Sequence, residues 1–206
     1  MLMNIFLFGI LIMAFMMVAA KRVSALIDGF RVQSFFLFML MFVLAYSADS
    51  TELYIVTALL FATKVILIPA MLRRVVKRIK VNEDLGLSVN PTVSIFAAIA
   101  LAYLAYAFTG MIAGIPAFFV SLSITLIGIF IMIFRMKAIA QIVGLLVMES
   151  GVFLTAASIS GGMPFIVEIA IFFDVFLAVI ILGIFVYKIN SLFTHIDIDK
   201  LTELKG

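Results

Sequence analysis

Long apolar stretches separated by short polar ones make up most of the chain. A helix that crosses the hydrocarbon core of a bilayer, which is about 30 Å thick, needs about 20 mainly apolar residues. The stretches long enough to do so predict seven membrane-spanning helices, at residues 2–20, 26–47, 52–72, 91–109, 114–134, 139–159 and 165–187. The pattern therefore predicts an all-α, polytopic membrane protein.

Lysine and arginine residues are concentrated at every second connection between the predicted helices. They lie at residues 21–31, 73–80, 135–137 and 188–205, whereas the connections around 48–51, 110–113 and 160–164 have none. Basic residues close to membrane-spanning helices stay on the cytoplasmic side. We therefore expect an N-terminus outside, a cytoplasmic C-terminus and a location in the cell (cytoplasmic) membrane.

Prolines and connections add local expectations. Pro91, Pro116 and Pro164 lie at predicted helix starts, where a missing backbone N–H costs little. Pro69 instead falls inside the third predicted helix and should bend it about one turn past Lys64. Residues 73–90 are basic and then polar, which predicts a short surface helix followed by a loop.

The topology suggests an internal repeat. The first three and the last three predicted helices run in the same directions, with one helix between them, as in a parallel 3+1+3 pseudo-repeat. We therefore divide the chain into an N-terminal three-helix unit (1–90), a linking helix (91–113), a second three-helix unit (114–190) and a cytoplasmic tail (191–206).

Composition narrows the chemistry. Hydrophobic residues make up 67% of the chain, charged residues 12%, and the mean hydropathy is +1.37, which is too apolar for a soluble domain of this length. With no cysteine and one histidine, the chain cannot ligate an iron–sulfur cluster, a blue-copper site or a structural zinc. The net charge of +3 is too small to indicate nucleic acid binding. No nucleotide-binding or nucleophile motif is present, so we do not expect an enzyme that acts alone.

Three ionisable residues, Lys64, Glu149 and Asp174, lie deep inside predicted membrane helices. At a rise of 1.5 Å per residue, Glu149 lies about 15 Å from the cytoplasmic edge, Asp174 about 14 Å from the outer edge and Lys64 about 18 Å from the outer edge. A charge at bilayer depth is costly and usually functional. These residues are therefore the candidate proton relay.

The chemistry of the relay candidates leaves alternatives open. Two carboxyl groups in a poorly hydrated pocket would not both ionise readily, so one would keep its proton, as a proton carrier must. Alternatively, Glu149 and Asp174 each form a hydrogen bond to a neighbouring helix and only stabilise packing. Lys64 could be a relay base, or the counter-charge of a carboxylate in this chain or a partner, or part of a structural ion pair.

Four further charged residues lie near predicted helix ends. Asp28 and Arg31 are three residues apart at the start of the second helix, and we expect a helix-surface pair or an interfacial anchor rather than a gate. Glu52 and Glu168 begin the third and seventh helices, where they could cap a helix or line an exit path.

Residues 117–206 combine three predicted helices with an acid in the second and in the third. The segment 144–150 reads GLLVMES, Asp174 is followed by an apolar run to Tyr187, and the tail 195–206 reads HIDIDKLTELKG. This region resembles the K subunit of respiratory complex I and the related subunit of Mrp-type cation antiporters. In that comparison the first glutamate of the K subunit aligns with Leu146, one turn before Glu149, and the second aligns with Asp174. With its N-terminal helices, the whole chain resembles the hydrogenase-4 component E family.

The resemblance implies a non-redox membrane subunit of a complex I-like, energy-converting [NiFe] hydrogenase or formate hydrogenlyase complex. Such a subunit would pass protons or sodium ions along the membrane midplane, between antiporter-like subunits and the hydrogenase or formate-oxidising module. The [NiFe] and iron–sulfur centres would lie in partner subunits, and this chain would hold no cofactor or metal. A subunit of an Mrp-type Na⁺/H⁺ antiporter, and a purely structural membrane scaffold, are the alternatives.

Overall fold

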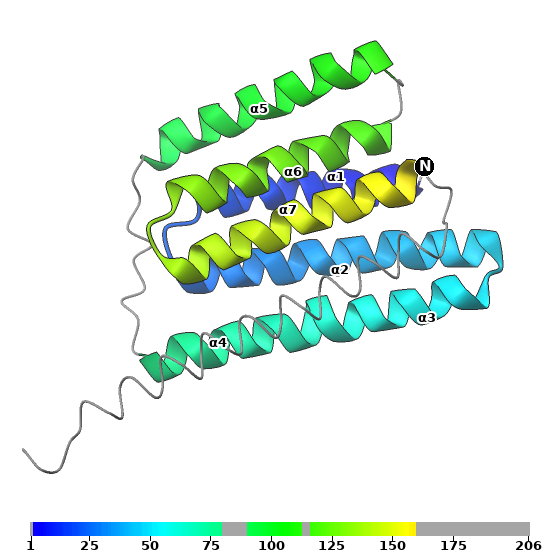
Figure 1. The fold of residues 1–206 in the computed structure, drawn as a ribbon, viewed down its shortest axis with the longest axis horizontal. Coiled ribbons are helices and arrows are strands. Elements are labelled where there is room, and N and C mark those ends of the chain that lie inside the picture. Colours follow the sequence, from blue (N-terminus) through cyan, green and yellow to red (C-terminus); the bar gives the residue numbers. More distant parts are fainter. Residues whose placement is uncertain (1, 80–89, 113–115, 160–206) are drawn as a thin grey trace, which may run out of the picture.

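The computed structural model describes residues 2–79, 90–112 and 116–159, and these residues form a bundle of long helices (Figure 1). The helices are α1 (Leu2–Ala19), α2 (Val23–Ala48), α3 (Thr51–Leu60), η1 (Phe61–Leu67), α4 (Ile68–Ile79), α5 (Pro91–Ile112), α6 (Pro116–Phe134) and α7 (Ala138–Ile159). Within these ranges five helical stretches are long and apolar enough to cross a membrane, and α1 is a shorter apolar helix. The predicted all-α, polytopic membrane fold is therefore confirmed.

The helices are arranged side by side, with α5 at one edge and the continuous helix α3–η1–α4 at the other (Figure 1). The closest pairing is between α6 and α7, followed by that between α1 and α2. Helix α2 also packs against α3, η1, α4 and α7, so it connects the two halves of the bundle. The buried core is apolar, and large apolar side chains such as Ile5, Phe8 and Ile12 also face outward, as expected where lipid covers the surface.

Six of the seven predicted helices are found in the structure. Their ends agree to within a few residues, except that the third helix extends beyond its predicted end at residue 72. The prediction of a separate surface helix after residue 73 is wrong, because α4 continues the third membrane helix without a break to Ile79. Residues 80–89, the seventh predicted helix at 165–187 and the cytoplasmic tail lie outside the described residues. The proposed pseudo-repeat therefore stays a prediction.

The third membrane helix is irregular just before Pro69, and whether it also bends there stays a prediction. A π-helical segment, η1, occupies Phe61–Leu67 and includes Lys64, and Ile68 donates its backbone N–H to the carbonyl of Thr63. In a regular α-helix the proline ring would clash with the carbonyl of Val65, four residues earlier. A wider π-helical turn relieves this clash, and it spans the residues on both sides of Lys64 up to Leu67.

Helices α6 and α7 approach each other through glycine. A Cβ atom added to Gly144 would lie 2.6 Å from the backbone nitrogen of Met132 and 3.0 Å from the carbonyl oxygen of Gly128. Neither helix could come this close with a side chain at that position. Small residues commonly permit such backbone contact between membrane helices. The contact holds α7 against α6 within two turns of Glu149.

Candidate functional site

Lys64 is the most deeply buried charged residue that the described ranges contain, with 1% of its side chain exposed. It lies at the centre of η1, about 20 Å along the helix from Thr51. Both η1 and α7 pack against α2, and the long side chain of Lys64 reaches α7. The ammonium group is therefore placed inside the bundle and not at its surface.

Glu149 is the partner of Lys64. Its carboxylate oxygen Oε1 lies 3.2 Å from Lys64 Nζ, and 5% of its side chain is exposed. Glu149 lies about 16 Å along α7 from Ala138, which is close to half the thickness of a bilayer core. The two charges form an ion pair near the middle of the membrane-spanning bundle.

Other residues of α7 surround the lysine ammonium. Lys64 Nζ donates a hydrogen bond to Ser150 Oγ at 3.4 Å, and Ser150 Oγ in turn donates to the carbonyl of Leu146 at 2.9 Å. The second hydrogen bond uses the only proton of the hydroxyl group, so Ser150 can act towards Lys64 only as an acceptor. The ring of Phe153, one turn further on, has its centroid 5.9 Å from Nζ, within the range of a cation–π interaction.

Gln33 and Ser34 of α2 form a second polar group at a similar depth, and neither is among the candidates predicted from the sequence. Each is 1% exposed, and the Gln33 amide and the Ser34 hydroxyl have no hydrogen-bond partner among the described residues. They lie about 15–17 Å along α2 from Val23, whereas Glu149 lies about 16 Å along α7. The signal available in the sequence was a pair of adjacent polar residues inside an apolar run.

The other charged candidates are not part of this site. The carboxylate of Asp28 pairs with Arg73 of α4, so the expected pair with Arg31 is wrong, while the alternative of an interfacial anchor stays a prediction. The reason is that α2 and α4 lie side by side where both carry charges. Glu52 is exposed in the first turn of α3, where the helix dipole favours an acid. Asp174 and Glu168 lie outside the described residues.

Arg135 is a buried charge for which the sequence predicted only a place in a connection. It follows the last residue of α6 and is 3% exposed, and its Nη2 donates a hydrogen bond to the carbonyl of Val18 at 2.5 Å. Burial lowers the pKa of its guanidinium below the ordinary value, because the charged form loses hydration. A cation beside the last turn of α1 also matches the negative end of that helix dipole. Arg135 therefore joins α1 to α6 and does not serve the ion pair.

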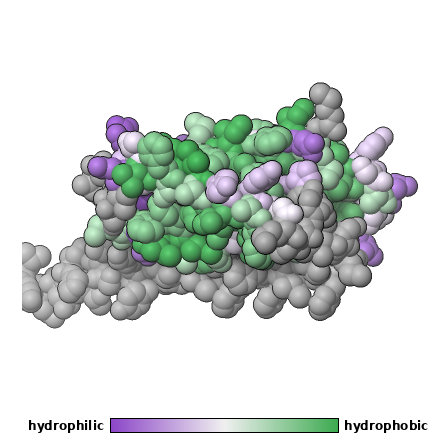
Figure 2. All heavy atoms as spheres, turned by 90° about the horizontal axis from the view of Figure 1, so that it is seen from above, coloured by the Kyte–Doolittle hydropathy of each residue, from purple (hydrophilic) through white to green (hydrophobic). Residues whose placement is uncertain are grey.

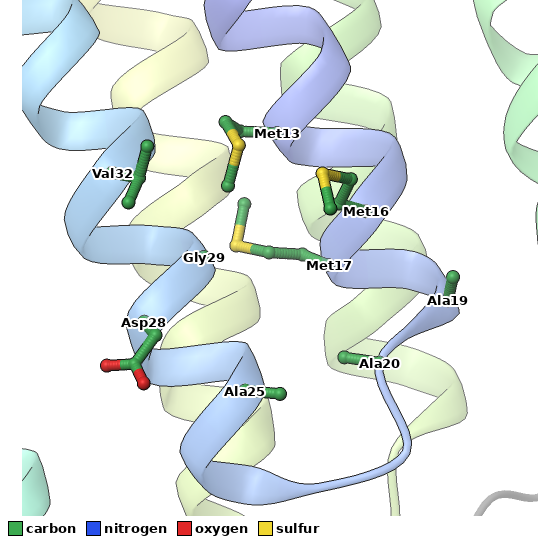
Figure 3. A pocket seen from close by; sticks show the side chains of 9 residues that line it. All are labelled: Met13, Met16, Met17, Ala19, Ala20, Ala25, Asp28, Gly29 and Val32. Carbon is green, nitrogen blue, oxygen red and sulfur yellow. The ribbon is translucent and has the colours of Figure 1, made fainter.

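A cavity of about 490 Å³ lies between the C-terminal half of α1 and the start of α2. Methionine side chains point into it from α1, while Asp28 lies at its edge with its carboxylate turned away from them (Figure 3). Neither Lys64 nor Glu149 lines it. Its apolar walls do not offer a binding site for an ion or a polar substrate.

Comparisons with known proteins find relatives of this chain in three bacteria. It is 32% identical over 162 residues to hydrogenase-4 component E of Escherichia coli K12, a match that covers 75% of this chain and 74% of that protein. The component E of Shigella flexneri matches to the same extent. A Mycobacterium tuberculosis protein described as uncharacterized is 36% identical over 91 residues, which are 44% of this chain and 40% of that protein. No family model and no solved structure matches the chain.

Proposed function

Because the chain belongs to the hydrogenase-4 component E family, we propose that it is a non-redox membrane subunit of a hydrogenase complex. In more detail, we propose that the complex is of the complex I-like, energy-converting hydrogenase or formate hydrogenlyase type. The chain then contributes a relay for protons, or for sodium ions, between antiporter-like subunits and the module in which the redox reaction takes place. The [NiFe] and iron–sulfur centres belong to other subunits.

The observation that carries the relay proposal is the buried ion pair between Lys64 and Glu149. Ionisable residues inside a membrane protein are expensive, and they commonly mark proton and ion pathways. The two groups are within hydrogen-bonding reach, so a proton arriving at Glu149 removes its negative charge and weakens its hold on Lys64. Ser150 then accepts a hydrogen bond from the lysine while Glu149 is protonated. This arrangement allows Glu149 to gain and lose a proton without leaving Lys64 unsolvated.

Two further groups extend the relay in this proposal. Gln33 and Ser34 supply a donor and acceptors at the depth of the ion pair, where ordered water could bind them. Asp174 is the acid deep inside the seventh predicted helix, and we propose that it exchanges protons with Glu149. The path then runs across the bundle, parallel to the membrane plane, towards neighbouring subunits.

The test is Glu149→Gln in the assembled complex, reconstituted into lipid vesicles. The amide keeps the shape of the side chain but cannot carry the proton, so we expect the number of ions moved per redox turnover to fall about tenfold or more. A pH-sensitive dye inside the vesicles measures proton movement, and hydrogen production measures turnover.

Glu52→Gln is the matched control. It removes an exposed carboxylate from the first turn of α3, about three turns before Lys64 on the same continuous helix. It should leave both measurements unchanged. Undiminished ion movement in Glu149→Gln would contradict the relay and favour the structural scaffold. A purified complex without [NiFe] and iron–sulfur subunits would instead favour the antiporter alternative.

A further inference from the structure

Helix α5 is the least covered membrane helix of the described bundle. In its most apolar stretch 28% of the residues are buried, against 44–56% in the four other long spans. It packs mainly against α6 and α1, and the residues that face these helices are small: Ser94, Ala98, Ala105 and Thr109. The larger side chains of α5 therefore point away from the bundle.

The outward face of α5 carries tyrosine within an apolar surface. Phe96, Tyr103 and Tyr106 are 67%, 69% and 64% exposed. Figure 2 views the molecule from the side on which α5 lies in Figure 1, and it shows less apolar residues within a mainly hydrophobic surface. Tyrosine usually lies at the edges of a membrane, where its hydroxyl group meets water.

Tyr103 lies too deep for its hydroxyl group to reach either edge. It is about 18 Å along the helix from Pro91 and about 13 Å from Ile112. Side chains on a helix lean towards its N-terminus, so the ring points back towards the middle of the helix and not towards the nearer end. In an apolar environment a hydroxyl group without a hydrogen-bond partner is unfavourable.

Neither lipid nor the described part of the chain satisfies this hydroxyl group. Lipid chains have no hydrogen-bond acceptor, and the 69% exposed side chain of Tyr103 forms no hydrogen bond within the described ranges. Along one stripe through Tyr103 lie Phe96 and the small residues Ala100, Ala107 and Gly110, and the large residues Ile99 and Tyr106 lie on its other side. A Cβ atom added to Gly110 would meet no atom within 4 Å, so the stripe is open. Small residues beside a polar one are typical of contacts between membrane helices.

We propose that the stripe Phe96–Ala100–Tyr103–Ala107–Gly110 of α5 binds a transmembrane helix of another subunit. That helix carries a hydrogen-bond acceptor, a carboxylate or an amide oxygen, near the middle of the membrane and opposite the Tyr103 hydroxyl. The inference rests on the proposed function only in that it requires a complex with other membrane subunits. It does not depend on the ion relay, because α5 carries neither Lys64 nor Glu149.

The first test compares variants in the complex purified through a tag on this chain. Tyr103→Phe removes the hydroxyl group and keeps the ring, and one lost membrane hydrogen bond should weaken the binding of a membrane partner about 3- to 10-fold in mild detergent. Tyr46→Phe is the control, since Tyr46 is equally exposed but lies near the end of α2. Ala107→Phe should release the same partner by blocking close approach, whereas Leu104→Phe, beside the stripe, should not.

The second test identifies the partner. A photoreactive benzoyl-phenylalanine at position 103, activated in native membranes, should form an adduct with a membrane segment of a different subunit that has a polar residue at mid-depth. Unchanged thermal unfolding of the isolated chain shows that Ala107→Phe acts on the contact and not on the fold. Adducts with lipid alone or with a second copy of this chain would overturn the proposal, as would full retention of all subunits by both Tyr103→Phe and Ala107→Phe. Ion movement is not measured in these tests, so they can fail while the relay holds.

Discussion

A buried lysine and a buried glutamate stabilise a membrane protein only as a pair. Each charge loses its hydration on burial, and the 3.2 Å contact between Lys64 and Glu149 returns part of that loss. Removal of one partner leaves an uncompensated charge, which costs about 3–5 kcal/mol, whereas removal of both is often neutral. The energetics of the pair therefore differ from those of two independent residues.

We expect Lys64→Met and Glu149→Gln, as single variants, to lower the free energy of unfolding by about 3–5 kcal/mol each. The double variant should recover most of this loss, because no unpaired charge remains inside the bundle. Thermal unfolding of the purified chain in detergent measures the effect. Additive losses in the double variant would show that the two residues do not act as a pair.

At the scale of residues, the sequence predicted the depth of the charges but not their contacts. The fixed rise of a helix is enough to place Lys64 and Glu149 in one layer. Which helices become neighbours depends on packing across the bundle, so the sequence left the partner of Lys64 open. Arg135 shows the same limit, because the sequence predicts only its place in a connection, while packing against α1 buries it.

At the scale of helices, the contact between α6 and α7 fixes the position of the ion pair. Gly144 lies five residues before Glu149 and touches the backbone of α6 at Met132. A side chain at this position would push α7 away from α6 and move Glu149 relative to Lys64. The glycines were visible in the sequence, but their facing positions were not.

Gly144→Ala should destabilise the chain by about 1–3 kcal/mol, because the added methyl group meets backbone atoms that cannot move aside. Gly110→Ala is the matched control, since its methyl group would point into open space, and alanine favours a helix over glycine by about 0.5–1 kcal/mol. Thermal unfolding should therefore shift in opposite directions for the two variants. Equal shifts would argue against the tight contact between α6 and α7.

The third membrane helix shows where the prediction of elements failed. Pro69 indicated a distortion about one turn past Lys64, but a proline does not specify whether the helix bends there or widens into a π-helical turn. The structure widens the helix into the π-helical segment Phe61–Leu67, with Lys64 at its centre. Hydrophobic patterns also could not distinguish a separate surface helix from the continuation of the same helix into α4.

At the scale of the whole molecule, basic residues gather at one end of the bundle. Helices α1, α4 and α6 end there, and α2, α5 and α7 begin there, with Arg22, Arg73 and Lys137 among the charges. The opposite end carries Asp49 and Glu52 instead. The sequence was sufficient to predict this asymmetry. Two membrane helices lie between one basic segment and the next, so the chain returns to the same end of the bundle each time. The orientation in the membrane stays a prediction, with the basic end in the cytoplasm.

Cysteine labelling tests this orientation directly, because the natural chain contains no cysteine. Met136→Cys places a thiol at the basic end, at a residue that is 72% exposed, and Ser47→Cys places one at the opposite end. Neither change alters a charge, so the basic residues that set the orientation are kept.

We expect a membrane-impermeant maleimide added to intact cells to label Ser47→Cys, and to label Met136→Cys only after the membrane is opened. Ala45→Cys is the control for access through the bilayer, since Ala45 is fully buried and should react in neither condition. Labelling of Met136→Cys in intact cells would place the basic end outside and reverse the predicted topology.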